Sequence, residues 1–208
     1  MFDPALLAPE RVRPLKRREY EELVELGVFG DERVELLRGV LVEMTPQGEP
    51  HARISAWFAQ RLIKALSLAR YEVRTHSPFA ATDDSMPEPD VSVSLQRTDG
   101  KHPSQALLLI EVAGSSVTKD RNIKTEIYAE AGVPEYWIVN LRTDTVEVLR
   151  RPTVAGYQQK LTKRIGDVLR PLRLRGVQFE VAKIPWLPRA DDAPMPRAKR
   201  RRSPRPRR

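Results

Sequence analysis

"ALLLIEVAGSSVTKDRNIK", residues 106–124, places a single carboxylate inside an apolar run. Four apolar residues precede Glu111, and the chain is apolar again at Val112 and Ala113. An ionised group among apolar neighbours loses its hydration, which is costly or shifts its pKa unless the charge is paired. We therefore expect Glu111 to be paired with another side chain of this chain or with a cation.

The segments around this stretch read as strands and helices in alternation. Strands are expected at 71–81, 89–95 and 106–113, and the turn-rich links between them favour antiparallel neighbours. A helix from about Val117 to Ala131 follows. Further elements are expected as a helix at 16–26, a hairpin about Arg38-Gly39, a helix at 51–68, a hairpin over 135–152 and strand-like alternation at 172–181. This order predicts an α/β (α+β) fold, a mixed sheet with flanking helices.

Length and composition indicate one domain with a charged extension. The chain has 208 residues, 40% of them hydrophobic, and we expect one domain over residues 1–188. It contains no cysteine, which excludes disulfides and thiolate metal sites and favours hard cations. No secretory signal is recognisable and no run approaches the roughly 20 apolar residues that span a bilayer. A cytoplasmic protein without a membrane partner is expected.

The net charge of +8 is concentrated at the end of the chain. Residues 189–208 hold nine Arg or Lys and two Asp, a net of +7, so residues 1–188 are nearly neutral. Broken by prolines and poor in apolar residues, this tail is expected to be disordered. It either contacts polyanions through non-specific phosphate binding or serves only as a solubilising extension.

A second carboxylate is expected beside Glu111. Asp90 begins the strand "PDVSVSL", on the opposite face from Val91. The two carboxylates share a face if strands 89–95 and 106–113 are antiparallel neighbours in which opposed residue numbers add to an odd total. Two carboxylates brought together repel each other unless a cation neutralises them, and oxygen ligands of this kind suit Mg²⁺.

The helix that follows supplies a basic group. Ile123, Ile127 and Ala131 form an apolar stripe expected to face the sheet, and Asp120, Lys124 and Tyr128 form the stripe beside it. Lys124 is thus expected at the border of the buried face, above the end of the strand that carries Glu111. An ammonium group there would orient an attacking water or stabilise transition-state charge.

Purely structural roles remain open for these residues. Asp120 and Lys124 also fit an ordinary exposed helical pair, and Asp90 fits a strand-start residue that bonds a local amide. Buried ion pairs with only a structural role exist as well, which leaves this alternative open for Glu111.

The ordered set "PDVSVSL", "LLLIEVAGSS" and "KDRNIKTEIYAEAGVPEYWIV" resembles the Uma-two family of restriction endonucleases, a bacterial branch of the PD-(D/E)xK nuclease superfamily. The similarity runs from about Val34 to Val148. It implies a restriction endonuclease-like core in which Asp90 and Glu111 are metal ligands. Where the superfamily has a lysine two residues after the glutamate, this chain has Ala113. In the Uma-type branch the lysine comes from the next helix, which matches Lys124.

The resemblance also implies roles for residues around this centre. Asp120 lies one turn before the lysine, and Glu35 and His51 fit accessory positions near the site. A histidine at the start of a helix is more often a surface or capping residue, so both readings of His51 stay open. His76 and His102 lie in strand and turn contexts and are assigned no partner.

The function expected from these features is a Mg²⁺-dependent endonuclease that hydrolyses DNA by metal-activated water attack, with Mn²⁺ as a substitute ion. Asp90, Glu111, Lys124 and Asp120 are the expected catalytic residues. The alternative is a nuclease-like fold without catalysis that binds nucleic acid or a protein partner. A homodimer is an expectation from family analogy alone.

Overall fold

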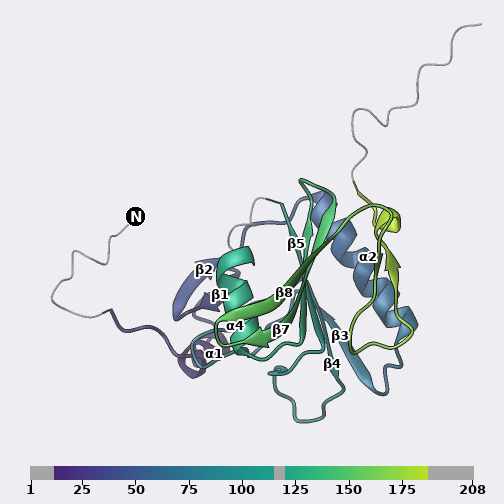
Figure 1. Ribbon diagram of the computed structural model, residues 1–208. Helices are drawn as coiled ribbons and strands as arrows, with labels where there is room; N and C mark the ends of the chain where they lie inside the picture. The colour runs from purple at the N-terminus through teal and green to yellow at the C-terminus, as the bar shows by residue number, and fades with distance from the viewer. Residues whose placement is uncertain (1–11, 115–119, 187–208) are drawn as a thin grey trace, which may run out of the picture.

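A six-stranded mixed sheet forms the centre of the computed structural model, which describes residues 12–114 and 120–186 (Figure 1). The strand order is β3-β4-β5-β6-β7-β8, and only β5 and β6 run parallel. The strands are β3 (Tyr71–Thr75), β4 (Val91–Leu95), β5 (Leu108–Ala113), β6 (Glu135–Asn140), β7 (Thr145–Thr153) and β8 (Gly156–Lys163). The predicted mixed α/β fold is confirmed. The basic tail, predicted at 189–208, lies outside the described residues.

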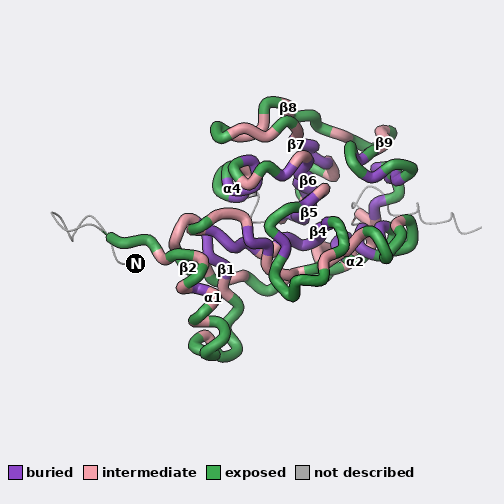
Figure 2. The backbone as a smooth tube through the Cα atoms, turned by 90° about the horizontal axis from the view of Figure 1, so that it is seen from below, coloured by how far each residue is buried: buried purple, intermediate pink, exposed green. Residues whose placement is uncertain are grey.

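Helices cover both faces of this sheet. Helix α2 (Glu49–Ala65) packs on one face, and helix α4 (Thr125–Glu130) packs on the other (Figure 2). The buried side chains of α2 recur about every four residues and form one core cluster with alternate residues of β4 and β5. The other residues of β5, Leu109 and Ala113, pack against α4 instead. Glu111 therefore points to the α4 face, since side chains alternate along a strand.

An N-terminal unit of one helix and one hairpin borders the α4 face. It consists of α1 (Arg17–Glu25), β1 (Val34–Leu37) and β2 (Val40–Glu43). The two-residue turn between the strands has φ 51° at Arg38 and φ 76° at Gly39, the positive values that a tight hairpin needs. A Cβ on Gly39 would lie 2.3 Å from Pro14 Cβ, so no larger residue fits. The predicted hairpin is confirmed.

Strand β3 is shorter than predicted, because it ends at Thr75 rather than continuing to residue 81. His76 takes φ 45°, which breaks the extended backbone, and Pro78 cannot donate to a ladder. The bend keeps His76 beside β4, where its amide nitrogen donates to the carbonyl oxygen of Asp90 at 3.3 Å.

The predicted helix over 117–131 consists of two parts. A π-helical turn, η2 (Asp120–Lys124), leads into α4, and residues 115–119 lie outside the described chain. A π turn holds an extra residue, so it rotates the side chains relative to an α-helix. Ile123, predicted to face the sheet, is 41% exposed, whereas Lys124 is buried. The prediction for Ile123 was therefore wrong, and the extra residue explains why.

The C-terminal part of the described chain is mostly irregular. The predicted strand at 172–181 was wrong except for β10 (Phe179–Glu180), which pairs with β9 (Val168–Leu169) before the short helix η3 (Val181–Lys183). Leu174 and Val177 are buried in the core cluster that contains α2 but lie outside any strand, so the alternation there reflects burial without a ladder. Among the described residues, no helix has both the length and the apolar character to cross a membrane.

Candidate active site

The two predicted carboxylates lie on one face of neighbouring strands. Val91 opposes Ile110 and Ser92 opposes Leu109, so opposed residue numbers add to an odd total, the register that places Asp90 and Glu111 on one face. Continuing this register one step beyond β4 places Asp90 opposite Glu111. Both are 4% exposed. The alternation of β4 thus aims its core-facing valines at α2 and brings Asp90 to the α4 side, where Glu111 lies.

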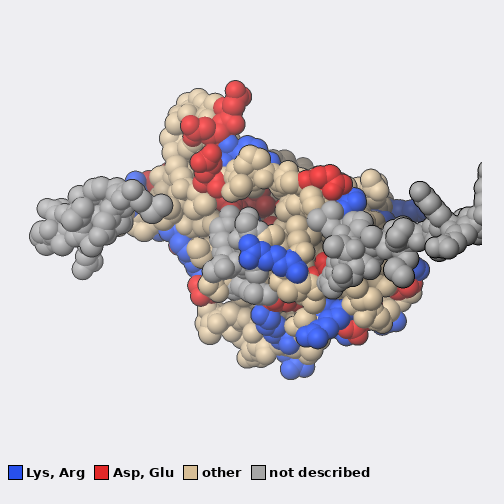
Figure 3. All heavy atoms as spheres, turned by 90° about the horizontal axis from the view of Figure 1, so that it is seen from above, with Lys and Arg blue, Asp and Glu red and all other residues tan. Residues whose placement is uncertain are grey.

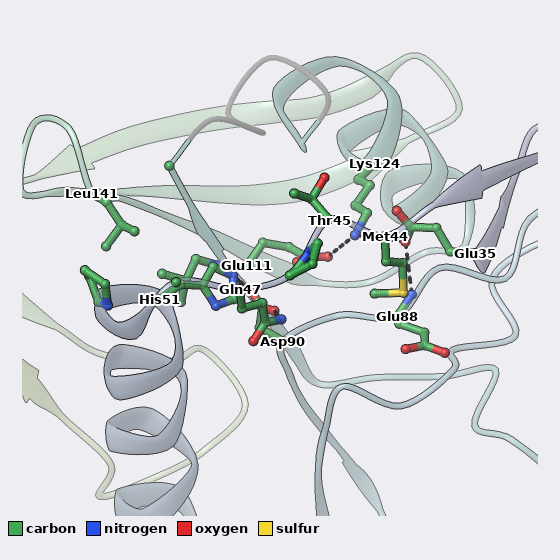
Figure 4. Close-up of a pocket in the computed structure, with 15 residues that line it drawn as sticks. Glu35, Met44, Thr45, Gln47, His51, Glu88, Asp90, Glu111, Lys124 and Leu141 are labelled. Atoms are coloured by element: carbon green, nitrogen blue, oxygen red, sulfur yellow. Dashed lines mark hydrogen bonds and ion pairs between the residues drawn. The ribbon is translucent and has the colours of Figure 1, made fainter. Parts of the chain in front are cut away.

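Lys124 extends from the π turn to two carboxylates, those of Glu111 and Glu35. Its Nζ lies 2.8 Å from Glu111 Oε1 and 3.1 Å from Glu35 Oε2, and the residue is 3% exposed. Figure 4 shows the lysine pointing from its helix toward these two side chains. The predicted position at the border of the buried face was too shallow, because the π turn rotates Lys124 fully inward.

Asp90 is held by donors from three different segments. The amide nitrogen of Val112 donates to its Oδ2 at 2.7 Å, His51 Nε2 lies 3.0 Å from the same oxygen, and Gln47 Nε2 donates to Oδ1 at 3.1 Å. His76 Nδ1 lies 3.3 Å from Oδ1. Burial alone would raise the pKa of Asp90, but the hydrogen bonds from the two histidines and from the Val112 amide hold that pKa well below its usual range. Asp90 is therefore ionised.

Glu111 is positioned by a tyrosine as well as by the lysine. Tyr128 Oη donates to Glu111 Oε1 at 2.9 Å, and Tyr128 is fully buried. Burial and the charge of Glu111 raise the pKa of Tyr128 well above its usual value, so the phenol stays protonated and keeps donating. One carboxylate oxygen thus accepts hydrogen bonds from two groups that lie four residues apart on the same helical segment.

Asp90, Glu111 and Lys124 border a cavity of about 210 Å³. Seen from above, acidic atoms are recessed between other residues near the middle of this face of the molecule (Figure 3). The lining comes from β1, the loop before α2, the start of α2, the segment before β4, the end of β5, the π turn and the residue after β6: Glu35, Met44, Thr45, Pro46, Gln47, Gly48, Pro50, His51, Glu88, Asp90, Glu111, Val112, Gly114, Lys124 and Leu141. Four of these residues are acidic and one is a lysine. Such a lining suits a cation.

The donor set fits a hard divalent ion. Asp90 and Glu111 offer carboxylate oxygens, and a chain without cysteine offers no soft thiolate ligand. Within the described residues, no three His, Asp or Glu side chains are arranged to hold an ion by themselves. Mg²⁺ usually keeps several waters and takes only one or two protein carboxylates together with substrate oxygens, so a set of two is compatible with it.

The structure brings together most of the predicted site residues. Glu35, an expected accessory residue, is fully buried, contacts Lys124 and accepts a hydrogen bond from the amide of Glu88 at 3.3 Å. His51 contacts Asp90, which favours an accessory role in the site over a surface or helix-capping role. The side chain of Asp120 lies outside the described part of the chain, so its expected role stays a prediction.

Three contributors to this site received no role from the sequence: His76, Gln47 and Tyr128. His76 and Gln47 reach Asp90 from loops, and a loop's path carries no periodic signal. Tyr128 lies four residues after Lys124 on the same helical stripe, and this spacing could have predicted that both side chains lie near Glu111.

Comparison with known proteins supports a relationship over most of the described chain. The family model Uma2, described as "Putative restriction endonuclease", matches residues 17–182. A crystal structure of "a putative nuclease belonging to DUF820" from Anabaena variabilis has a TM-score of 0.64 and 16% sequence identity, covering 82% of this chain and 97% of that chain. At 16% identity, this similarity shows a shared fold. No curated protein matches the sequence. The matched range contains Glu35, Asp90, Glu111 and Lys124. Because the family model matches most of the chain, the chain belongs to the Uma2 family.

Proposed function

We propose that this protein is a Mg²⁺-dependent endonuclease that hydrolyses phosphodiester bonds of DNA. One observation carries the proposal: Asp90 and Glu111 share a face of neighbouring strands, and the Lys124 ammonium contacts Glu111 at 2.8 Å beside an acidic cavity. Membership of a family described as restriction endonucleases supports the same reaction.

Asp90 and Glu111 are the proposed metal ligands. A bound Mg²⁺ would lower the pKa of a bound water and offset the charge that builds on a phosphoryl group. The Val112 amide and the two histidines fix the direction of Asp90, while Tyr128 fixes that of Glu111. Ligands whose orientation is set by surrounding hydrogen bonds bind metal more tightly than mobile ones.

Lys124 is the proposed basic group that orients the attacking water or stabilises charge in the transition state. Lys124 is 3% exposed, and a buried ammonium group interacts more strongly with developing negative charge than it would in solution. Glu35 Oε2 also lies 3.1 Å from Lys124 Nζ, and it would keep the ammonium group in place if Glu111 held a metal ion. Asp120, one turn earlier, is proposed to orient the lysine or to assist in metal binding.

Nicking of supercoiled plasmid tests the proposal. The protein with Mg²⁺ or Mn²⁺ is expected to nick the plasmid, and EDTA is expected to stop the reaction. Lys124→Gln should remove nicking while leaving the far-ultraviolet circular dichroism spectrum unchanged. Lys101→Gln is a matched control, because Lys101 is exposed and lies outside the cavity.

The outcome also separates this proposal from the non-catalytic alternative. Binding of DNA in EDTA, together with no nicking under either metal, would reject the enzyme and leave a nuclease-like binding module. Full nicking by the Lys124→Gln variant would reject the role assigned to the lysine.

A further inference from the structure

One side of helix α2 connects the catalytic cavity with a second cavity. Pro50 lines the catalytic cavity, whereas Trp57, Arg61 and Lys64 line a cavity of about 430 Å³ between α2 and residues 176–183. These four residues occupy positions i, i+7, i+11 and i+14, which all fall on one face of an α-helix. A polymer that leaves the catalytic cavity along this face therefore reaches the second one.

The second cavity has a basic lining. Arg61, Lys64 and Lys183 contribute three positive charges, and Glu180 contributes one negative charge. Lys183 Nζ lies 2.6 Å from Glu180 Oε1, so these two charges offset each other. Among the described residues, neither Arg61 nor Lys64 has a carboxylate within ion-pair distance. Their charges remain available to an anion from outside.

Trp57 holds the Arg61 guanidinium in a defined position. The guanidinium carbon lies 3.9 Å from the centroid of the indole ring. The ring itself packs against Phe58 and Phe179, with centroid distances of 5.0 and 5.7 Å. Stacking on an aromatic face uses none of the guanidinium N–H groups, which lie in its plane and match the oxygens of a phosphate. The guanidinium over the Trp57 ring therefore keeps its N–H groups available as hydrogen-bond donors to a phosphate.

The spacing along the helix fits a duplex. An α-helix rises 1.5 Å per residue, so Arg61 lies about 15 Å along α2 from His51, and Lys64 about 20 Å. At about 3.4 Å per base pair, 15 Å corresponds to roughly four base-pair steps. A duplex that places one phosphate in the catalytic cavity thus has further phosphates within reach of this face.

We propose that Trp57, Arg61 and Lys64, the α2 basic face, bind the phosphate backbone of the nucleic acid a few base pairs from the cleaved bond. The assignment of nucleic acid as the polymer rests on the proposed function. The face supplies affinity and position rather than chemistry, because phosphate contacts fix the register of a protein on DNA.

Salt-dependent binding tests the α2 basic face without requiring catalysis. A fluorescein-labelled duplex of about 30 base pairs, roughly three helical turns, is titrated with the full chain in EDTA and followed by fluorescence anisotropy. Arg61→Gln/Lys64→Gln should weaken binding on the order of tenfold or more at about 0.1 M salt. The slope of log K against log salt should become shallower by about 1.8, since each lost phosphate contact contributes about 0.9.

Lys101→Gln/Arg164→Gln is the matched control, since it removes the same charge from exposed positions outside both cavities. Equal losses in the two double variants would overturn the proposal, because net charge alone would then explain the effect. A wild-type affinity retained by Arg61→Gln/Lys64→Gln would also overturn it. Plasmid nicking measured in parallel tests the proposed function separately: a selective loss of binding with no wild-type nicking would keep the α2 basic face and reject the nuclease.

Discussion

Two buried glutamates, Glu111 and Glu135, each contact a basic side chain, yet their surroundings differ. Glu135 Oε1 accepts from Trp137 Nε1 and from Arg150 Nη2, both at 2.8 Å, and Glu135 Oε2 accepts from the Leu172 amide. One carboxylate is matched to one guanidinium, and the donors come from β6, β7 and the segment beyond them. This arrangement joins the irregular C-terminal segment to the sheet.

Glu111 lies in a different arrangement. It contacts the same ammonium group as Glu35, and all three residues border a cavity whose lining also includes Asp90 and Glu88. Burial and ion pairing are common to both glutamates, so neither property distinguishes a structural pair from a functional one. The accumulation of acidic groups around an open volume distinguishes them, and it is the feature expected of a cation site.

The largest expected effect is on catalysis. Glu111→Gln and Asp90→Asn should each reduce plasmid nicking about 1,000-fold or more, because removing a ligand is expected to cost more than the 10- to 100-fold typical of residues that only support ligands. Initial rates at saturating Mn²⁺ measure the effect. Glu135→Gln should retain wild-type nicking at a temperature where it is folded. A comparable loss of nicking in Glu135→Gln would contradict the claim that Glu111 is functional and Glu135 structural.

The loss in free energy of unfolding should be larger for a substitution at Glu135 than for one at Glu111. Glu135→Ala leaves the partly buried Arg150 and the Trp137 indole without their acceptor, and such a loss typically costs about 3–5 kcal/mol. Urea denaturation measures the free energy of unfolding. Glu111→Gln should cost less, because it relieves the repulsion between Glu111 and Glu35. A Glu111→Gln variant as unstable as Glu135→Ala would indicate that the Glu111 pair is structural.

A smaller effect is expected at Tyr128. Tyr128→Phe removes one hydrogen bond to Glu111 and keeps the ring in the core, so Mn²⁺ affinity should fall about 10- to 100-fold. Calorimetric titration of Mn²⁺ gives the affinity. Tyr136→Phe, a change at a second buried tyrosine of the same core cluster, serves as the control. Equal affinities of Tyr128→Phe and the wild type would exclude a positioning role.

The positions of Asp90, Glu111 and Lys124 could be predicted because the sequence patterns around them are periodic. Alternation along β4 and β5 sets the faces of Asp90 and Glu111, and the i, i+4 spacing relates Lys124 to Tyr128. The hairpin about Gly39 was likewise predictable from local turn chemistry. These features depend on neighbouring residues alone.

The remaining features depend on tertiary contacts. The π turn inserts one residue into a helix whose sequence reads as a regular α-helix, and it exposes Ile123 while burying Lys124. His76 reaches Asp90 because its backbone leaves the strand at φ 45°, which no pattern in the sequence announces. In the segment 172–178, Leu174 and Val177 are buried in the core cluster that also contains α2, and their spacing resembles the alternation of a strand.

The smallest effect concerns acid stability at Asp90. The folded-state pKa of Asp90 lies below its usual value of about 3.9, so its ionised form stabilises the fold fully above that pH. This stabilisation is lost as the pH falls through the folded-state pKa. The difference in unfolding free energy between wild type and Asp90→Asn should therefore narrow from pH 6 toward pH 3. A difference that stays constant over this interval would contradict the hydrogen-bonded, ionised state of Asp90.

The position of a divalent ion tests the central claim most directly. Anomalous difference density from a crystal soaked in Mn²⁺ should show one ion between the carboxylates of Asp90 and Glu111, and the peak should disappear in Glu111→Gln. The absence of an ion at that position at saturating Mn²⁺, or a peak unchanged in Glu111→Gln, would contradict the account.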